Sequence, residues 1–192
     1  MEIVEIRTPR LLIRNLKLED LSDFHLYRSN PEVTRYQGFD VMTIDQAKEF
    51  IQGQLGKEFG SAGEWGQYGI ENKDTGKIVG DCAIKLHQND TRIAEIGITI
   101  SHLEQQKGYA KEVLSGILFF LFNTKHIHRV VEIVDTENVA SIRLLKSLGF
   151  RPEGHFIENI FFKGKWGSEF QYAMLKKEWD KKHGCADKEG LE

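Results

Sequence analysis

The stretch that decides the fold of this chain is EIGITISHLEQQKGYA, residues 95–110. Its first half alternates apolar with other side chains, and this period is typical of a half-buried β-strand. Its end, QQKGYA, is small and polar and contains a glycine, and an apolar helical pattern follows it at once. The stretch therefore predicts a strand, a tight loop, and a helix that begins directly at the loop.

A helix that begins at such a loop can bind an anion. The first N–H groups of a helix have no partner within it, and the helix dipole is positive at this end. Gly108 and Ala110 are small enough for the backbone to approach a ligand, while Lys107 and Lys111 add positive charge. A plain tight turn remains the alternative. The chain has neither a GxxxxGK(S/T) nucleotide loop nor a GxGxxG dinucleotide fingerprint after a strand.

Length and composition favour one globular domain. The chain has 192 residues, of which 40% are hydrophobic and 29% charged, and its net charge is -3. We expect a single domain over residues 1–180, followed by a flexible tail over residues 181–192. The mild acidity gives no general attraction to nucleic acid, so we expect no such partner.

The two cysteines, Cys82 and Cys185, lie far apart and in no metal-ligand spacing, which favours a reducing, cytoplasmic environment. The N-terminus has no apolar signal core. The longest apolar run, residues 117–122, is much shorter than the roughly 20 residues of a membrane span, so we expect no membrane partner. His126 and His128 precede a strand without a third ligand in view, so we expect no metal.

Periodicity and turn residues predict an α/β (α+β) fold. The expected strands, in chain order, are residues 11–16, 65–71, 77–87, 92–100, 129–135, 154–162 and 168–175. The expected helices are residues 18–29, 43–59, 109–123 and 138–148. Thr43 is the expected N-cap of the second helix, Asn30-Pro31 ends the first, and Gly149 ends the last. We expect a mixed, mostly antiparallel sheet with helices on both faces.

QQKGYA matches the pattern Arg/Gln-x-x-Gly-x-Gly/Ala of the acyl-CoA pyrophosphate loop, so the chain resembles the GNAT family of N-acetyltransferases. The segment DTENVASIRLLKSLGF, residues 135–150, resembles the next block of that family. TPRLLIRNLKLEDLSDF, NPEVTRY and FFKGKWGSEFQYAML are similar to the branch that includes the ribosomal-protein N-terminal (alanine/serine) acetyltransferases. These ordered blocks span residues 8–175, which is nearly the whole chain.

The resemblance implies acetyl-CoA as cosubstrate and a primary amine as acceptor. It implies that the sheet is splayed between the fourth and fifth strands, residues 92–100 and 129–135, leaving edges free to pair with the pantetheine arm. The arm would lie beside Ile98, Thr99 and Ile100, and Asn138 would bind its amide, although simple helix capping by Asn138 is the alternative. The residues expected around the pyrophosphate are Gln105, Gln106, Lys107, Gly108, Tyr109, Ala110 and Lys111.

An amine that attacks a thioester must first lose a proton, so the site needs a base. Glu95 is the first choice, because the family often carries its acid in this strand; a surface acid is the alternative, and Glu158 and His155 are further candidates. Many relatives carry a Tyr where this chain has Leu145, so the usual acid for the departing thiolate is missing. The resemblance to the branch implies that Ser141 lies near the sulfur instead. The alternative is that Ser141 is only a small residue that allows close helix packing. No cysteine lies near a base, so we expect direct attack in a ternary complex.

The acceptor pocket is the part that the sequence determines least. The aromatic and amide candidates for its lining are Tyr36, Gln37, Trp65, Phe161, Phe162 and Trp166. The branch often has an Asp where this chain has Ser168, followed by Glu169. We expect a protein N-terminal amine as acceptor; the alternatives are a polyamine or aminoglycoside, or a non-catalytic acyl-CoA-binding regulator. A homodimer is compatible with the branch, but no stretch identifies an interface.

Overall fold

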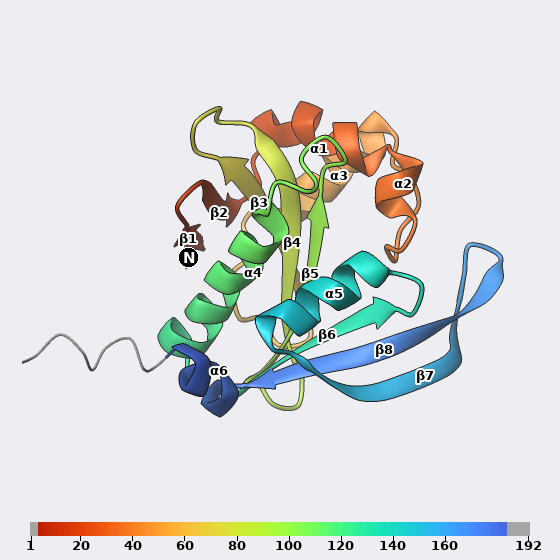
Figure 1. The fold of residues 1–192 in the computed structure, drawn as a ribbon. Coiled ribbons are helices and arrows are strands. Elements are labelled where there is room, and N and C mark those ends of the chain that lie inside the picture. The colour runs from red at the N-terminus through yellow and green to blue at the C-terminus, as the bar shows by residue number, and fades with distance from the viewer. Residues whose placement is uncertain (1–3, 184–192) are drawn as a thin grey trace, which may run out of the picture.

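An eight-stranded sheet organises the computed structural model, which describes residues 4–183 (Figure 1). Its strands lie in the order β1-β2-β3-β4-β5-β6-β8-β7, and only the β5–β6 pair is parallel. The strands are β1 Glu5–Arg7, β2 Leu11–Asn15, β3 Trp65–Asn72, β4 Ile78–Leu86, β5 Ile93–Ile100, β6 Arg129–Asp135, β7 Arg151–Phe162 and β8 Lys165–Leu175. The mixed, mostly antiparallel sheet is confirmed, while β1 was not predicted.

Helices cover both faces of this sheet (Figure 1). They are α1 Leu21–Arg28, α2 Pro31–Thr34, α3 Ile44–Gln54, α4 Tyr109–Phe119, α5 Val139–Leu148 and α6 Lys176–His183. A 3-10 turn, Leu18–Asp20, precedes α1, and a π-helical turn, Phe120–Thr124, follows α4. The predicted helix over residues 43–59 is too long: it ends at Gln54, because Gly56 and Gly60 adopt left-handed φ values of 76° and 99°.

Proline at position 31 begins a helix as well as ending one. The prediction that Asn30-Pro31 stops α1 is confirmed, but α2 starts at Pro31 itself. The Asn30 side chain accepts a hydrogen bond from the Glu32 N–H at 2.9 Å, which caps the new helix. Proline is well tolerated at the first helical position, where its missing N–H would be unpaired anyway. The chain therefore turns between two helices within a few residues.

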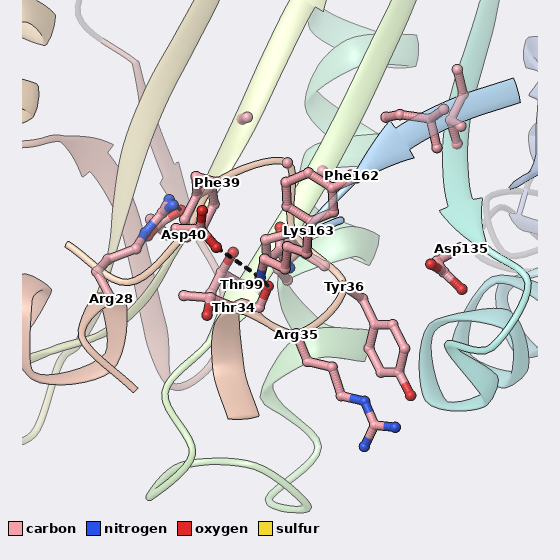
Figure 2. A pocket seen from close by; sticks show the side chains of 18 of the residues that line it. Arg28, Thr34, Arg35, Tyr36, Phe39, Asp40, Thr99, Asp135, Phe162 and Lys163 are labelled. Atoms are coloured by element: carbon pink, nitrogen blue, oxygen red, sulfur yellow. Dashed lines mark hydrogen bonds and ion pairs between the residues drawn. The ribbon is translucent and has the colours of Figure 1, made fainter. Parts of the chain in front are cut away.

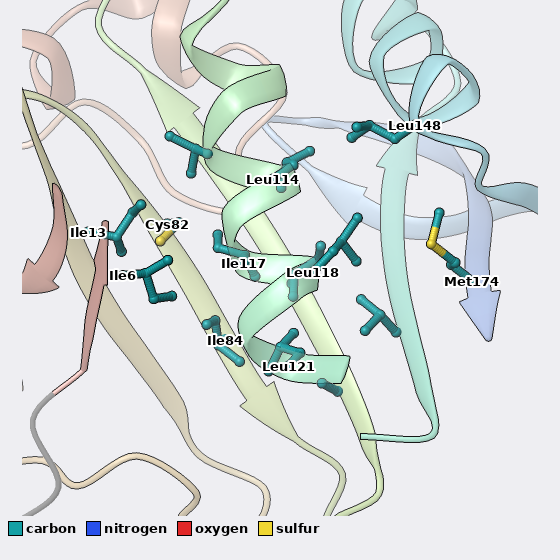
Figure 3. Close-up of a cluster of buried hydrophobic side chains, with 14 of the residues drawn as sticks. Ile6, Ile13, Cys82, Ile84, Leu114, Ile117, Leu118, Leu121, Leu148 and Met174 are labelled. Atoms are coloured by element: carbon teal, nitrogen blue, oxygen red, sulfur yellow. The ribbon is translucent and has the colours of Figure 1, made fainter. Parts of the chain in front are cut away.

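Each helical layer has its own apolar core. On one face, α4 points Leu114, Ile117 and Leu118 at the strands (Figure 3), and Cys82 of β4 is fully buried there. On the other face, a separate cluster joins Phe24 and Tyr27 of α1 to the buried side of α3. Burying each such side chain contributes roughly 1.5–3 kcal/mol before the entropy of ordering is subtracted.

The sheet parts between β5 and β6, as predicted. The two strands pair only at Ile93 with Arg129, Ala94 with Val130, and Glu95 with Val131. Beyond Glu95 the strand β5 stays paired with β4 as far as Ile100. Strand β6 likewise stays paired with β8 as far as Asp135. The two halves of the sheet therefore diverge like a wedge, and both strands carry a free edge inside it.

The C-terminal part of the described chain is helical. We expected a flexible tail from residue 181, but residues 181–183 complete α6, and Trp179 packs against Phe122 with ring centroids 5.9 Å apart. The rest of that predicted tail, residues 184–192 with Cys185, lies outside the described residues. Within residues 4–183, no helix combines the length and the apolar character that crossing a membrane requires.

Candidate functional site

The loop between β5 and α4 presents free backbone N–H groups where the sequence predicts an anion site. Gln106 and Gly108 have left-handed φ values of 63° and 82°, and no side chain caps α4 at Gly108. Within the described residues, the N–H groups of residues 105–111 donate to no protein acceptor. A curled run of free N–H groups at a helix N-terminus is complementary to phosphate oxygens, so these residues fit a pyrophosphate.

Arg10, just before β2, holds this loop in place. Its Nη1 donates to the Lys107 carbonyl at 3.0 Å, and its guanidinium lies 4.6 Å from the centroid of the Tyr109 ring. Its Nε donates to Glu112 Oε2 at 2.7 Å, while the Thr8 hydroxyl donates to Glu112 Oε1 at 2.6 Å. Although burial raises the pKa of Glu112, these hydrogen bonds bring it below its ordinary value. The pattern-based prediction missed Arg10, whose only signal was its place in the block TPRLLIR.

The start of α5 lies directly after β6 and supplies two predicted site residues. Asn138 Oδ1 accepts a hydrogen bond from the Ser141 N–H at 3.1 Å, so the capping alternative for Asn138 is confirmed. Its Nδ2 group and the Ser141 hydroxyl have no hydrogen-bond partner among the described residues, and both side chains are half-buried. Both groups are therefore free to bind a ligand. Leu145, one turn further on, is fully buried in the apolar core.

A cavity of 1040 Å³ opens over the wedge on the opposite face of the sheet, next to α1–α3 (Figure 2). The predicted residues Ile98 and Thr99 line it, and Gln105 Nε2 donates to the neighbouring Ile100 carbonyl at 3.2 Å. Acidic side chains outnumber basic ones in its wall. The acids are Glu32, Asp40, Asp81, Glu95, Asp135, Glu137 and Glu169, and the bases are Arg28, Arg35, Lys163 and Lys165. This balance favours a cationic occupant.

Asp81 forms a saturated buried network beneath this cavity. Its two carboxylate oxygens accept hydrogen bonds from Arg28 Nη2 at 2.6 Å, Arg28 Nε at 3.0 Å and the Tyr27 hydroxyl at 2.6 Å. Gln67 Nε2 is a further donor. The Arg28 guanidinium lies 3.9 Å from the centroid of the Phe39 ring, which covers it. Burial, followed by the charge of Asp81, raises the pKa of Tyr27 well above its ordinary value. Neither Arg28 nor Asp81 was predicted from the sequence as a site residue.

Glu95 faces the cavity and is paired there. Its Oε2 lies 2.6 Å from Lys85 Nζ, directly across the β4–β5 register, and its side chain is 16% exposed. Lys85 Nζ in turn lies 4.4 Å from the centroid of the Trp65 ring. The two other base candidates, Glu158 and His155, are exposed on β7 and do not line the cavity. Position thus favours Glu95 among the three.

The predicted acceptor-pocket residues divide into two groups. Tyr36, Gln37, Trp65 and Phe162 line the cavity. Phe161 and Trp166 do not, since they contact each other on the exposed β7–β8 hairpin with ring centroids 5.4 Å apart.

The side chain of Lys163, in the β7–β8 hairpin, spans the cavity. Lys163 Nζ donates to the Thr34 carbonyl at 2.6 Å and lies 3.7 Å from Asp40 Oδ1 (Figure 2). The hairpin is thereby tied to α2 and the loop after it, which limits the width of a molecule that enters from this side.

Glu132, in the middle of β6, is a buried carboxyl that the sequence analysis missed. Its signal was an acid inside the apolar run RVVEIVD. It is 6% exposed, and its Oε2 has no hydrogen-bond partner within the described residues. Burial raises the pKa of Glu132 to about 8. Among residues 4–183, no group of three or more His, Cys, Asp or Glu side chains is placed to hold a metal ion.

Comparison with known proteins gives a consistent family. The model of the acetyltransferase (GNAT) domain matches residues 10–151. An uncharacterized N-acetyltransferase of Bacillus licheniformis is 30% identical over 173 residues, which cover 90% of this chain and 96% of the relative. The ribosomal protein uS5-alanine N-acetyltransferase of Escherichia coli is 27% identical, over 67% of this chain and 68% of the relative.

Solved structures share the fold. A GNAT-family acetyltransferase from Bacillus anthracis superposes with a TM-score of 0.81 and 26% identity, covering 91% of this chain and 99% of that one. A spermidine N-acetyltransferase from Vibrio cholerae, solved with CoA and spermine, superposes with a TM-score of 0.75 and 22% identity. That match covers 88% of this chain and 98% of the other.

Proposed function

This chain belongs to the GNAT family of acetyltransferases, and we propose that it transfers the acetyl group of acetyl-CoA to a primary amine on a cationic acceptor. One observation carries the proposal. The sheet parts between a loop of free N–H groups and a cavity lined by an excess of acids. Acetyl-CoA bound at the loop would pass between the strands, and an amine bound in the cavity would meet its thioester there.

The donor side uses backbone more than side chains. The N–H groups of residues 105–111 bind the pyrophosphate, with Lys111 adding charge and Arg10 fixing the loop. The pantetheine arm pairs with the free edge of β5 beside Ile98, Thr99 and Ile100. The Asn138 Nδ2 group then donates to an amide carbonyl of the arm, while Oδ1 continues to cap α5. The Ser141 hydroxyl lies one turn further along and hydrogen-bonds to the sulfur.

Glu95 acts as the base in this proposal. It lines the cavity at the last residue pair before the strands separate, so a proton can pass to it from an amine or through one water. Lys85 holds its carboxylate in place. The amine then attacks the thioester directly, since the buried Cys82 has a pKa raised by burial and the charge of Asp81, and offers no reactive thiolate.

The acceptor is a slender cation. The acid excess of the cavity attracts an ammonium group, and the Lys163 bridge leaves room for a chain rather than for a folded surface. A polyamine and a flexible polypeptide N-terminus both have this shape. A panel of spermidine, an aminoglycoside, and peptides that begin with Ala or Ser separates these acceptors by the mass added to each.

A thermal melt with acetyl-CoA, and with NADH and ATP as controls, tests the donor side. A ligand that binds only the folded state adds roughly 2.7 kcal/mol of stability at a hundredfold excess over Kd. Gly108→Val should remove the acetyl-CoA shift, weakening affinity by about 100-fold, because φ there is 82° and the backbone must approach the ligand. The matched control is Gly56→Val, which places the same strain, at φ of 76°, in the turn that follows α3, where an added Cβ would meet no other atom within 4 Å.

Three outcomes distinguish the hypotheses. An acetyl-CoA shift in the wild type and in Gly56→Val, but not in Gly108→Val, supports the assignment of the loop to acetyl-CoA. The same shift with no acetylated product from any acceptor favours a non-catalytic acyl-CoA-binding regulator. The absence of a shift in the wild type contradicts the proposed function as a whole.

A further inference from the structure

We propose that Glu132 is a catalytic residue that donates a proton to the thiolate of CoA as it departs. The inference rests on the proposed function, because it requires acetyl-CoA between β5 and β6. It assigns a role to the one buried carboxyl oxygen that the described structure leaves without a hydrogen bond.

Glu132 lies where the wedge begins. The last β5–β6 pair joins Glu95 to Val131, so Glu132 is the first residue of β6 beyond its pairing with β5. Its side chain lies on the face shared by Val130 and Val134, toward the layer of α4 and α5. Glu95 lies on the opposite face and lines the cavity. The two carboxyls thus flank the point at which a thioester between the strands would react.

The surroundings of Glu132 keep the carboxyl neutral. Tyr172, its partner across the β6–β8 register, is the neighbouring titratable side chain on this face. The same face of β5 carries Ala94 and Ile96, and the helices contribute apolar side chains such as Leu145 to the same core. No charged group accounts for the raised pKa of about 8, which has burial as its cause. A carboxyl that is protonated at neutral pH can donate a proton.

An orphaned carboxyl is costly to keep. Buried polar groups in folded proteins nearly always have a hydrogen-bond partner, and an unsatisfied one destabilises the fold. A ligand that enters the wedge would supply the missing partner. The helix above offers no stronger donor, since Leu145 is a hydrocarbon and the Ser141 hydroxyl is a very weak acid. The position and the absence of a partner both point to the ligand.

Each proton that moves in the proposed reaction has a donor and an acceptor. As the N–C bond forms, the C–S bond breaks and sulfur takes its electron pair, together with the proton of Glu132. The proton that the nitrogen loses passes to Glu95 on the other face. Solvent then moves one proton from Glu95 to Glu132 after CoA has left, which restores both groups. An acid with a pKa of about 8 is well matched to a thiol whose ordinary pKa is near 8.5.

The test compares Glu132→Gln with the wild type, using the acceptor that the panel identifies. We expect kcat to fall by about tenfold or more at pH 7, while the Kd for acetyl-CoA stays within about twofold. The wild-type kcat should fall as pH rises through about 8, and the variant should lack this limb. Infrared spectra of the ligand-free proteins add a readout independent of turnover: the band of a protonated carboxyl should be present in the wild type and absent in the variant.

The outcomes separate this inference from the function on which it rests. If acetyl-CoA stabilises the wild type and an amine is acetylated, the function stands, and an unchanged kcat in Glu132→Gln overturns the role of Glu132 alone. An equal loss in kcat and in acetyl-CoA affinity also overturns it, since Glu132 would then only bind the donor. Glu49→Gln, an exposed change on α3, is the control for an amide substitution and should leave both constants unaltered.

Discussion

The surroundings of Asp81 and of Glu132 give two answers to the same problem, which is how to keep a carboxyl inside a protein. Asp81, on the cavity face, is fully buried and accepts hydrogen bonds from Arg28, Tyr27 and Gln67. Glu132, on the helix face, is nearly as buried, yet its Oε2 has no partner in the described structure. The carboxyl of Asp81 joins α1 to β4, whereas the Oε2 atom of Glu132 joins no two elements of the described protein.

Asp81 therefore contributes to the stability of the fold, whereas burial of Glu132 lowers it. Four donors stabilise the charge of Asp81, so that removing it would leave Arg28 buried without a counter-ion. Glu132 can lower its own cost only by remaining protonated, and that is the state a proton donor needs. Asp81 therefore stabilises the fold, whereas Glu132 destabilises it and is kept for function. Apolar substitutions at the two sites should change the free energy of unfolding with opposite signs.

The largest expected effect is a pH-dependent stabilisation by Glu132→Leu. The pKa of Glu132 is about 8 in the folded protein, against an ordinary value of 4.5, so between these limits the folded state keeps a proton that the unfolded state releases. Wild-type stability therefore falls as pH rises through this window, by about 1.4 kcal/mol per unit. The Leu variant lacks this loss, so its free energy of unfolding relative to the wild type should increase by roughly 4–5 kcal/mol between the two pKa values. Urea denaturation at about pH 5, 6.5 and 8 measures it, and a pH-independent difference would contradict the raised pKa.

The opposite sign is expected at the cavity face. Asp81→Ala should cost about 3–5 kcal/mol in the free energy of unfolding, because Arg28 would remain buried without its partner. Urea denaturation at pH 7 measures the change. Asp90→Ala, which breaks the exposed pair between Asp90 and Arg92, is the control and should have little effect. If the two variants were equally stable, the Asp81 network would not be the support described above.

A third carboxyl, Glu95, sharpens the comparison because it is neither saturated nor isolated. Glu95→Gln should lower kcat by about 100-fold, since the amide cannot take a proton from the attacking amine. Affinity for acetyl-CoA and thermal stability should change little, because the amide keeps the shape of the side chain and only the half-buried ion pair with Lys85 is lost. Steady-state kinetics together with an acetyl-CoA melt measures this. A wild-type rate in the variant would remove Glu95 from the mechanism.

The sequence determined the parts of the fold whose causes are local. The bounds of β6 were predicted correctly from its apolar run, and α5 follows its Asn138 cap and ends at Gly149, whose φ of 99° only glycine adopts readily. The parting of β5 and β6 came from the family resemblance. Elements with weak local signals were missed, among them β1, α2 and α6.

The missed site residues depend on contacts between distant parts of the chain. Arg28 and Asp81 meet only when α1 folds onto β4, and Arg10 reaches the pyrophosphate loop from the start of β2. Glu132 was missed for another reason, because a single acid inside the apolar run RVVEIVD belongs to no motif and has no spacing that marks it. Glu95 was placed correctly on its strand, but its cavity-facing ion pair with Lys85 follows from the register of β4 and β5.

The brief parallel ladder between β5 and β6 also bears on how the chain folds. Strands β2 to β5 and strands β6 to β8 each assemble through antiparallel pairing, and most of those pairs are neighbours along the chain. The three parallel pairs that join them must wait for the α4 crossover to form and dock. Non-local closure of this kind is slow, so we expect the β5–β6 junction to limit the folding rate and the two halves of the sheet to behave as cooperative units. We therefore expect the gap in which we propose that the cosubstrate binds to be also the last part of the sheet to close during folding.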